Sequence, residues 1–138
     1  MNGAGAIIAV DPGEKRTGLA VRDLDGTTYC QTIEPWGICV WLSSQPGNTI
    51  HHVVLEQWVP YPDAQAGNAW RDLVEVKQLG ALEWICKSRF IPYTYQPTQI
   101  LTPTQALADA DGYQWKATNR DEKAAESHLY YYLNLRKD

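Results

Sequence analysis

The chain has few cysteines, no long apolar run and no excess of basic residues. Its three cysteines, Cys30, Cys39 and Cys86, form no CxxC pair, which argues against a zinc site and favours reduced thiols in a cytoplasmic protein. No stretch approaches about 18 consecutive apolar residues, so we expect no transmembrane helix and no membrane partner. The start of the sequence also shows no signal-peptide pattern of basic, apolar and small residues.

The net charge of −4 is the opposite of the basic balance that is typical of dedicated DNA-binding domains. It does not exclude a metal-dependent nuclease, because bound metal ions reverse the local charge of a carboxylate cluster. The hydrophobic share is 44% and the charged share is 20%, as in globular proteins. A chain of 138 residues is long enough for one core, so we expect a single domain over residues 1–138.

The first apolar run of the sequence ends on an acid. Residues 6–10 are apolar, Asp11 follows, Pro12-Gly13 breaks the chain, and a second apolar run extends over 17–21. This order predicts a β-hairpin with Asp11 at the rim of a sheet. A buried carboxylate there is costly unless a partner such as a metal ion pairs with it. Asp-Pro-Gly is also ordinary turn chemistry, so this motif alone leaves both interpretations open.

A second apolar strand, predicted over residues 50–55, also ends on an acid, Glu56, and the proline-rich segment 57–62 follows it. Carboxylates at the ends of two strands meet when the strands are adjacent and parallel. The active sites of open α/β sheets lie at such strand ends. Asp11 and Glu56 therefore meet if their strands are neighbours in the sheet.

The last predicted helix, over residues 119–136, carries three acids. Asn119 is a good N-cap residue, and Glu122 three positions later fits a capping box. A rotation of about 100° per residue places Asp121 on the same face as His128, which is the apolar, core-facing side. Interaction with the helix dipole explains Glu122 well, but it does not explain the inward direction of Asp121.

Turn signals and hydrophobic periodicity predict the other elements. A proline at position 92 indicates that the strand containing it lies at an edge of the sheet. These elements are a strand over 27–33, a short helix or buried connection over 36–43, a long helix over 68–87, a strand over 90–95, a short helix over 102–108 and a polar loop over 109–118.

The segments 8–13, 54–57 and 121–126, in this order of elements, resemble a known family. The resemblance is to the ribonuclease H-like fold and, within it, to the RuvC-like Holliday-junction resolvases, especially the short phage-type ones. It implies an α/β protein with a five-stranded mixed sheet flanked by helices. It also implies an endonuclease that cleaves branched DNA as a homodimer through the long helix 68–87, in the host cytoplasm if a phage encodes it.

By the same resemblance, Asp11, Glu56 and Asp121 are the catalytic acids and bind two divalent metal ions. Two Mg²⁺ ions about 4 Å apart activate a water molecule and stabilise the leaving oxygen in phosphodiester hydrolysis. Mg²⁺ prefers hard carboxylate oxygens, which suits an acid set without cysteine. Mn²⁺ is the alternative metal.

The fourth metal ligand stays open at the level of sequence. The family places its two helix acids three residues apart, and that spacing leads from Asp121 to Ala124, which cannot bind metal. Counted back from the last acid of the helix, it leads to Lys123. The remaining candidates are Glu122, Glu126 and His128.

Basic and aromatic side chains near these segments are the candidate substrate contacts. Cations would bind phosphates, and aromatic rings would stack on bases near the branch point. The candidates are Lys15, Arg16, Gln57, Trp58, Tyr61, Arg71, Lys116 and Arg120.

Three other functions compete with this interpretation. A YqgF-like RNA-processing nuclease shares the fold and fits the segment 11–21, but it lacks the acid that stands at Glu56. A phosphotransferase of the actin and sugar-kinase type needs two such domains, and this chain is long enough for only one. A non-catalytic junction-binding protein would retain the fold without an intact set of acids.

Overall fold

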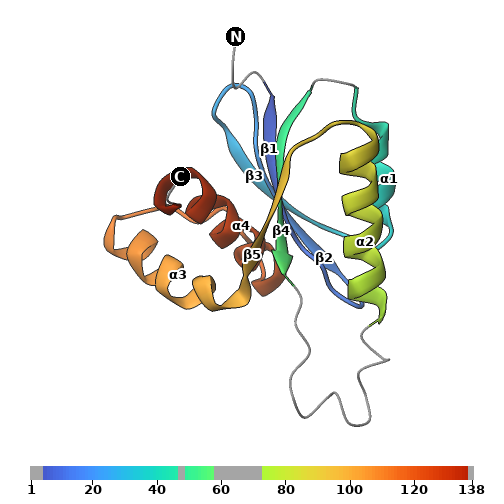
Figure 1. Cartoon of the computed structure of the whole chain (residues 1–138). Coiled ribbons are helices and arrows are strands. Elements are labelled where there is room, and N and C mark those ends of the chain that lie inside the picture. The colour runs from blue at the N-terminus through green and yellow to red at the C-terminus, as the bar shows by residue number, and fades with distance from the viewer. Residues whose placement is uncertain (1–4, 47–48, 58–72, 137–138) are drawn as a thin grey trace.

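The computed structural model describes residues 5–46, 49–57 and 73–136. Its centre is one five-stranded sheet with the strand order β3-β2-β1-β4-β5 (Figure 1). Strand β2 is antiparallel to β1 and β3, whereas β4 is parallel to β1 and β5. The predicted α/β class with a five-stranded mixed sheet is therefore confirmed. The strands are β1 (Ala6–Asp11), β2 (Thr17–Arg22), β3 (Thr28–Ile33), β4 (Ile50–Gln57) and β5 (Tyr93–Pro97).

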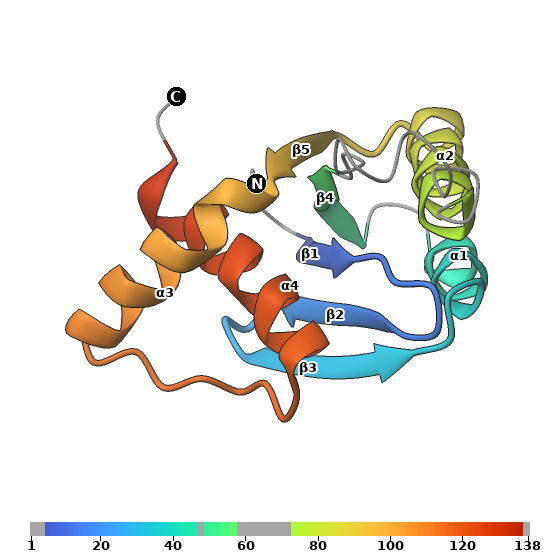
Figure 2. The same ribbon diagram turned by 90° about the horizontal axis from the view of Figure 1, so that it is seen from below.

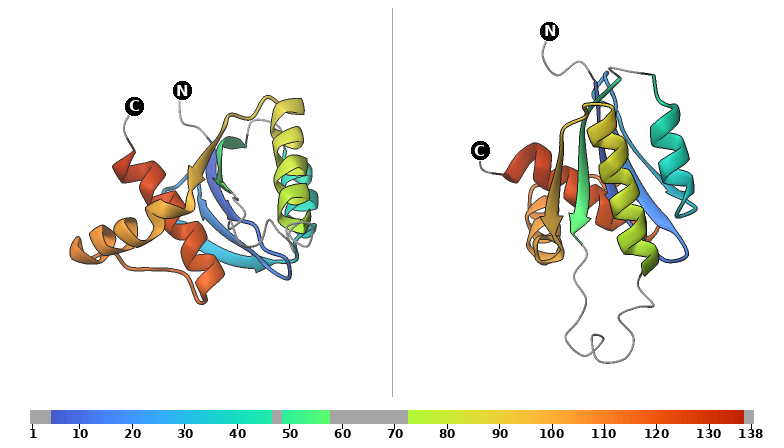
Figure 3. Two further views of the ribbon diagram at one scale, coloured as in Figure 1. Left: turned by 60° about the horizontal axis from the view of Figure 1, so that its bottom comes forward. Right: turned by 45° about the vertical axis from the view of Figure 1, so that its right-hand side comes forward.

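Helices cover both faces of the sheet. Helices α1 and α2 pack on one face, α4 lies across the other, and α3 packs against the outside of α4 (Figures 2 and 3). The α4 helix continues directly into a π-helical segment, Tyr131–Leu135. The helices are α1 (Gly37–Ser44), α2 (Leu73–Ser88), α3 (Leu101–Ala110), with a 3-10 turn Thr98–Ile100 before it, and α4 (Arg120–Tyr130).

Side-chain alternation along the central strands builds two cores. In β1, Ile8 and Val10 belong to the large cluster under α1 and α2, and Ala9 between them belongs to the cluster under α4. Successive side chains of a strand point to opposite faces, so a run that is apolar throughout serves both cores. The small side chains of Ala9 and Ala20 line the α4 side, which lets this helix lie close to the sheet.

The pairing of β1 with β4 positions the two predicted strand-end acids. The register places Val10 opposite Leu55, and each strand continues by one residue into an acid, Asp11 or Glu56. Because the strands are parallel neighbours, both acids emerge at the same edge of the sheet. Asp11 and Glu56 therefore lie on adjacent parallel strands, which is the condition under which the sequence predicts that they meet.

The end of α4 is fixed by aromatic contacts. Tyr132, in the π-helical segment, stacks on His52 of β4 with ring centroids 4.6 Å apart. The guanidinium carbon of Arg136 lies 3.9 Å from the centroid of the same ring. Stacking and cation–π attraction thus hold the far end of this helix against β4.

Two predicted elements have different bounds in the structure, and the start of a third lies outside the described residues. The fifth strand begins at Tyr93 rather than at residue 90, because Phe90 has a positive φ of 57° and Pro92 has no N–H for a ladder bond. It is an edge strand, as expected. The helix expected over 102–108 extends over Leu101–Ala110, and the first residues of the long helix expected over 68–87 lie outside the described residues.

The close approach of α4 to β2 yields a first testable prediction. A Cβ atom on Gly18 would lie 2.1 Å from the backbone oxygen of Asp121, so Gly18→Ala must push the first turn of α4 off the sheet. We expect the free energy of unfolding to fall by about 1–3 kcal/mol in urea denaturation.

Gly80 in α2 is the matched control, because a Cβ there meets no atom within 4 Å. Gly80→Ala should leave the stability unchanged or raise it by up to about 1 kcal/mol through helix propensity. Equal stabilities for the two variants would contradict the close packing at Gly18.

Candidate active site

Four polar side chains meet where β1 and β4 end. Asp11 and Glu56 share a side-chain hydrogen bond, and Asp121 and His128, both on α4, interact electrostatically with Asp11. The Nε2 atom of His128 lies 2.7 Å from Oε2 of Glu56. The structure thus brings together the three predicted acids with the histidine that the sequence offered as one alternative. We call these four residues the carboxylate cluster.

Burial dominates the electrostatics of the carboxylate cluster. Burial, the hydrogen bond to Glu56 and repulsion by Glu56 and Asp121 raise the pKa of Asp11 to about 9, against a weaker opposing effect of His128. Burial also raises the pKa of Glu56 above its ordinary value, although the hydrogen bond from Asp11 opposes this. At neutral pH the pair therefore retains a proton, and the cluster has a strong affinity for positive charge.

His128 is neutral in this environment. Its side chain is fully buried, and burial lowers its pKa to about 4, against the attraction of Asp11. Its Nδ1 atom lies 2.8 Å from the amide oxygen of Gln96, which is itself buried. Gln96 stands opposite Glu56 in the pairing of β4 with β5. Local sequence pattern does not single out Gln96; the available signal is a third strand with a polar residue near its end, which pairs with the strand of Glu56.

Arg16 neutralises the remaining acid. Its Nη2 atom lies 3.2 Å from Oδ2 of Asp121. The loop that carries Arg16 is hydrogen-bonded to Gln78 of α2. The Gln78 side chain donates to the carbonyl oxygen of Gly13 at 3.0 Å and accepts from the Thr17 hydroxyl at 2.5 Å. Gln78 is fully buried and is a second positioning residue that the helical pattern alone did not reveal.

Glu122 is engaged in holding the start of α4. Its Oε2 accepts from Thr32 Oγ1 of β3 at 2.6 Å, and its Oε1 accepts from the backbone N–H of Thr118 at 2.9 Å. Asn119 is the N-cap residue, as expected, and its side chain accepts from the N–H of Glu122. The carboxylate does not close the reciprocal half of the capping box on Asn119, since it bonds the preceding residue instead.

Glu126 is engaged in holding the loop before α4. It is fully buried and accepts from the backbone N–H groups of Lys116 and Ala117, at 3.0 and 2.9 Å, and from the hydroxyl of Tyr113 at 2.5 Å. The loop after α3, residues 111–118, is thus held in place by hydrogen bonds to an internal carboxylate. Because these donors occupy Glu122 and Glu126, we do not retain either acid as a metal-ligand candidate.

The predicted substrate contacts fall into two groups. Lys15 and Arg16 are exposed in the loop between β1 and β2, Gln57 is exposed at the end of β4, and Lys116 and Arg120 are exposed around the start of α4. Of these, Arg16 contacts the carboxylate cluster directly, through Asp121, whereas the backbone of Lys116 bonds to Glu126. Trp58, Tyr61 and Arg71 lie outside the described residues.

No preformed metal site of three or more His, Cys, Asp or Glu side chains occurs within residues 5–46, 49–57 and 73–136. In this arrangement the Glu56 side chain contacts Asp11 and His128, and Asp121 forms an ion pair with Arg16. The positive charge that the acids attract is supplied by Arg16 and by the retained proton. Over the same part of the chain, no helix has the length and apolar character needed to cross a bilayer.

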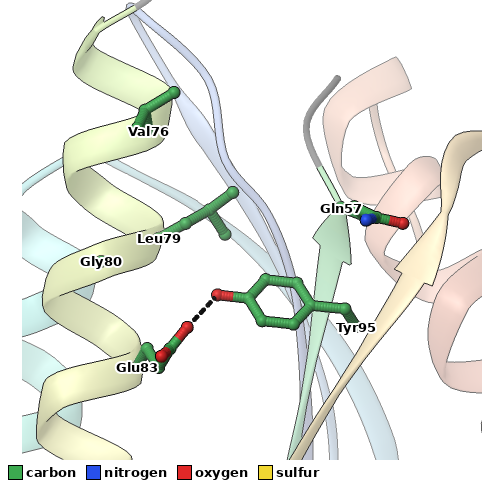
Figure 4. Close-up of a pocket in the computed structure, with 6 residues that line it drawn as sticks. All are labelled: Gln57, Val76, Leu79, Gly80, Glu83 and Tyr95. Atoms are coloured by element: carbon green, nitrogen blue, oxygen red, sulfur yellow. Dashed lines mark hydrogen bonds between the residues drawn. The ribbon is translucent and has the colours of Figure 1, made fainter.

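A separate hollow of about 330 Å³ lies between α2 and the β4–β5 edge. In Figure 4 the Tyr95 hydroxyl points across it to Glu83 of α2, to which it donates at 2.7 Å. None of the carboxylate cluster lines this hollow, which is on the α2 side of the sheet. Its lining residues are Gln57, Val76, Leu79, Gly80, Glu83 and Tyr95.

Comparison with solved structures identifies the fold. RuvC of T. thermophilus in complex with Holliday junction substrate superposes with a TM-score of 0.59 and 12% identity, over 94% of this chain and 95% of that one. A second Thermus thermophilus RuvC structure gives 0.60 and 14%, over 93% and 95%. The chain has the RuvC fold. The fowlpox virus Holliday junction resolvase also matches, with a TM-score of 0.54 and 16% identity, over 93% and 96%.

The predicted ribonuclease H-like architecture of the RuvC type is thus confirmed over nearly the whole chain. A scan against protein-family models finds no match, and a search of curated protein sequences finds none either. The RuvC fold is therefore recognised here through the arrangement of its elements, at sequence identities of 12 to 16%.

The raised pKa of Asp11 predicts how stability depends on pH. A group with a raised folded-state pKa stabilises the fold fully below its ordinary value, here 3.8, and this contribution is lost as the pH rises through about 9. In EDTA, we expect the free energy of unfolding to fall by at least about 1 kcal/mol between pH 5 and 9. Urea denaturation across this range measures the effect.

Asp11→Asn should flatten this pH dependence, since the amide cannot ionise. Glu14→Gln, an exposed acid of the adjacent loop, is the control and should retain the slope of the wild type. A wild-type stability that rises over the same range would contradict the proton retained by Asp11 and Glu56.

Proposed function

We propose that this chain is a metal-dependent endonuclease that cleaves branched DNA at four-way, or Holliday, junctions. The observation that carries the proposal is the pair of partly buried acids, Asp11 and Glu56, at adjacent parallel strand ends, with Asp121 joining them from α4. This acid set stands in a fold shared with junction resolvases, one of which has been solved with its junction substrate. A non-catalytic role would not require Asp11, Glu56 and Asp121 to lie so close together that they repel one another.

The proposed metal ligands are Asp11, Glu56, Asp121 and His128. Their chemistry fits a divalent cation, because burial and mutual repulsion oppose ionisation of the acids until positive charge arrives. Hard carboxylate oxygens suit Mg²⁺, and a neutral imidazole nitrogen suits Mn²⁺ as well. Two bound ions would supply a water nucleophile and stabilise the leaving oxygen of the phosphodiester.

The chain's own cations complete the proposed site. Lys15 and Arg16 are exposed in the loop that follows Asp11, and Lys116 and Arg120 are exposed around the start of α4, where they would contact DNA phosphates. Such local cations would allow a chain with a net charge of −4 to bind a polyanion. Phosphate contacts position the substrate without reading its sequence, which suits selection by branch shape.

We also propose that the protein acts in the cytoplasm as a homodimer, with one site for each cleaved strand. The proposed dimer face is on α2, where Val76 and Trp84 are 42% and 69% exposed. Exposed large apolar side chains on one helix are typical of protein interfaces. The part of the expected face before residue 73 lies outside the described residues.

A cleavage assay tests the proposed function. A labelled four-way junction, a linear duplex of matched sequence and a structured RNA are each incubated with Mg²⁺, Mn²⁺ or EDTA. We expect metal-dependent, paired nicks in the junction alone. Asp11→Asn, Glu56→Gln and Asp121→Asn should each lower the cleavage rate by about 100-fold or more, since each removes charge that the reaction needs.

The control is Glu34→Gln, an exposed acid beyond the end of β3, which should cleave at the wild-type rate. Junction binding without cleavage in either metal would favour a structural role. Cleavage of the RNA with the junction left intact would favour the RNA-processing alternative.

Arg16 gives an independent prediction about the metal and the DNA. Because Arg16 pairs with Asp121, Arg16→Ala frees that acid and should raise the affinity for Mn²⁺ by up to about fivefold, the limit set by an exposed ion pair. The same change should weaken junction binding through loss of a phosphate contact. Calorimetry without DNA and gel-shift assays in Ca²⁺ measure the two effects.

Lys15→Ala is the matched control, since Lys15 is exposed in the same loop. It should weaken junction binding without raising the Mn²⁺ affinity. Equal metal affinities for the Arg16 and Lys15 variants would show that Arg16 does not compete with the cation.

A further inference from the structure

A buried chain of polar groups runs from β5 through α4 to β4. The Gln96 amide oxygen lies 2.8 Å from Nδ1 of His128, and Nε2 of the same ring lies 2.7 Å from Oε2 of Glu56. His128 is fully buried and Gln96 is only 5% exposed, so water does not substitute for either contact. The orientation of this imidazole is therefore set by the two neighbouring strands.

The Gln96 contact decides which ring nitrogen carries the proton. A neutral imidazole has one N–H, and an amide oxygen can only accept, so the hydrogen belongs to Nδ1. Nε2 then presents its lone pair toward Glu56. The 2.7 Å contact between Nε2 and Oε2 of Glu56 then requires a hydrogen on that carboxyl oxygen, in addition to the one in the hydrogen bond from Asp11 to Glu56.

We propose that Gln96 is a positioning residue that fixes His128 in the Nδ1–H tautomer, with its Nε2 lone pair directed into the carboxylate cluster. The inference rests on the proposed function, in which His128 is a metal ligand. A ligating histidine needs a partner for its other ring nitrogen, and loss of such a partner weakens metal binding by about 10- to 100-fold.

The inference also accounts for a departure from the expected spacing on the last helix. The position three residues after Asp121 is Ala124, which has no donor atom. His128 lies further along α4 and contacts Glu56. Only its Nδ1–H tautomer leaves a lone pair on Nε2 that could bind a metal ion there. A glutamate at position 96 would keep the acceptor but add a further negative charge to a site that already repels charge.

Nitrogen-15 NMR of the histidine rings in metal-free protein at pH 7.5 tests the tautomer directly. We expect the wild type to show His128 protonated at Nδ1. Gln96→Leu, which is similar in size but cannot accept, should move the proton to Nε2. Gln96→Glu should keep the proton on Nδ1, which is a rescue that packing alone would not produce. His51 and His52 give reference signals in the same spectra.

Calorimetric titration with Mn²⁺ gives the second readout. Gln96→Leu should bind Mn²⁺ at least about tenfold more weakly than the wild type. The control is Gln105→Leu, because Gln105 also hydrogen-bonds a side chain of α4, donating its Nε2 to the hydroxyl of Ser127, the neighbour of His128, at 3.0 Å. This variant should match the wild type in tautomer and in Mn²⁺ affinity.

Three results would overturn the inference. They are a wild-type His128 protonated at Nε2, a Gln96→Leu variant with the wild-type tautomer, and an equal loss of Mn²⁺ affinity in the Gln105 variant. If Gln96→Leu does not fold, the wild-type and Gln96→Glu spectra still decide the tautomer. The spectra are recorded without metal or DNA, so they test the tautomer independently of cleavage. A protein that shows the Nδ1–H tautomer but does not cleave junctions would contradict the nuclease proposal and leave the tautomer inference standing.

Discussion

Mutual repulsion between two partly buried carboxyl groups is the constraint around which this molecule is arranged. The parallel pairing of β1 with β4 forces Asp11 and Glu56 to the same sheet edge, and burial removes the water that would screen them. The retained proton and the Arg16–Asp121 pair offset that repulsion. A site organised in this way is unfavourable for folding and favourable for a cation, which is typical of a stability–activity trade-off.

Helix α4 separates structural from chemical roles along its length. Its first turn approaches β2 closely because Gly18 has no side chain, and this contact brings Asp121 to the cluster. Glu122 and Glu126 bond to β3 and to the preceding loop. Acidic residues of the same helix thus have different roles. Asp121 belongs to the carboxylate cluster, whereas the hydrogen-bond donors around Glu122 and Glu126 show that these two hold the structure together.

Much of this organisation could be predicted from local pattern. Apolar runs that end on single acids indicated β1 and β4, and helical periodicity placed Asp121 and His128 on one inward face. The role of Glu126 could not be predicted, because its donors are backbone groups of a loop that looks polar and irregular in sequence. Gln96 was missed because its significance depends on a neighbouring strand and on a helix far away in the chain.

The anchoring of α4 at two points has a consequence for substrate selection. His128 holds the helix to Glu56 near one end of β4, and Tyr132 stacks on His52 nearer the other end. The helix cannot slide along the strand without breaking both contacts, so the acids have one fixed geometry. In the proposed reaction, the DNA must therefore deform to reach the site. A branch point, where base stacking is already interrupted, deforms at lower cost than a continuous duplex.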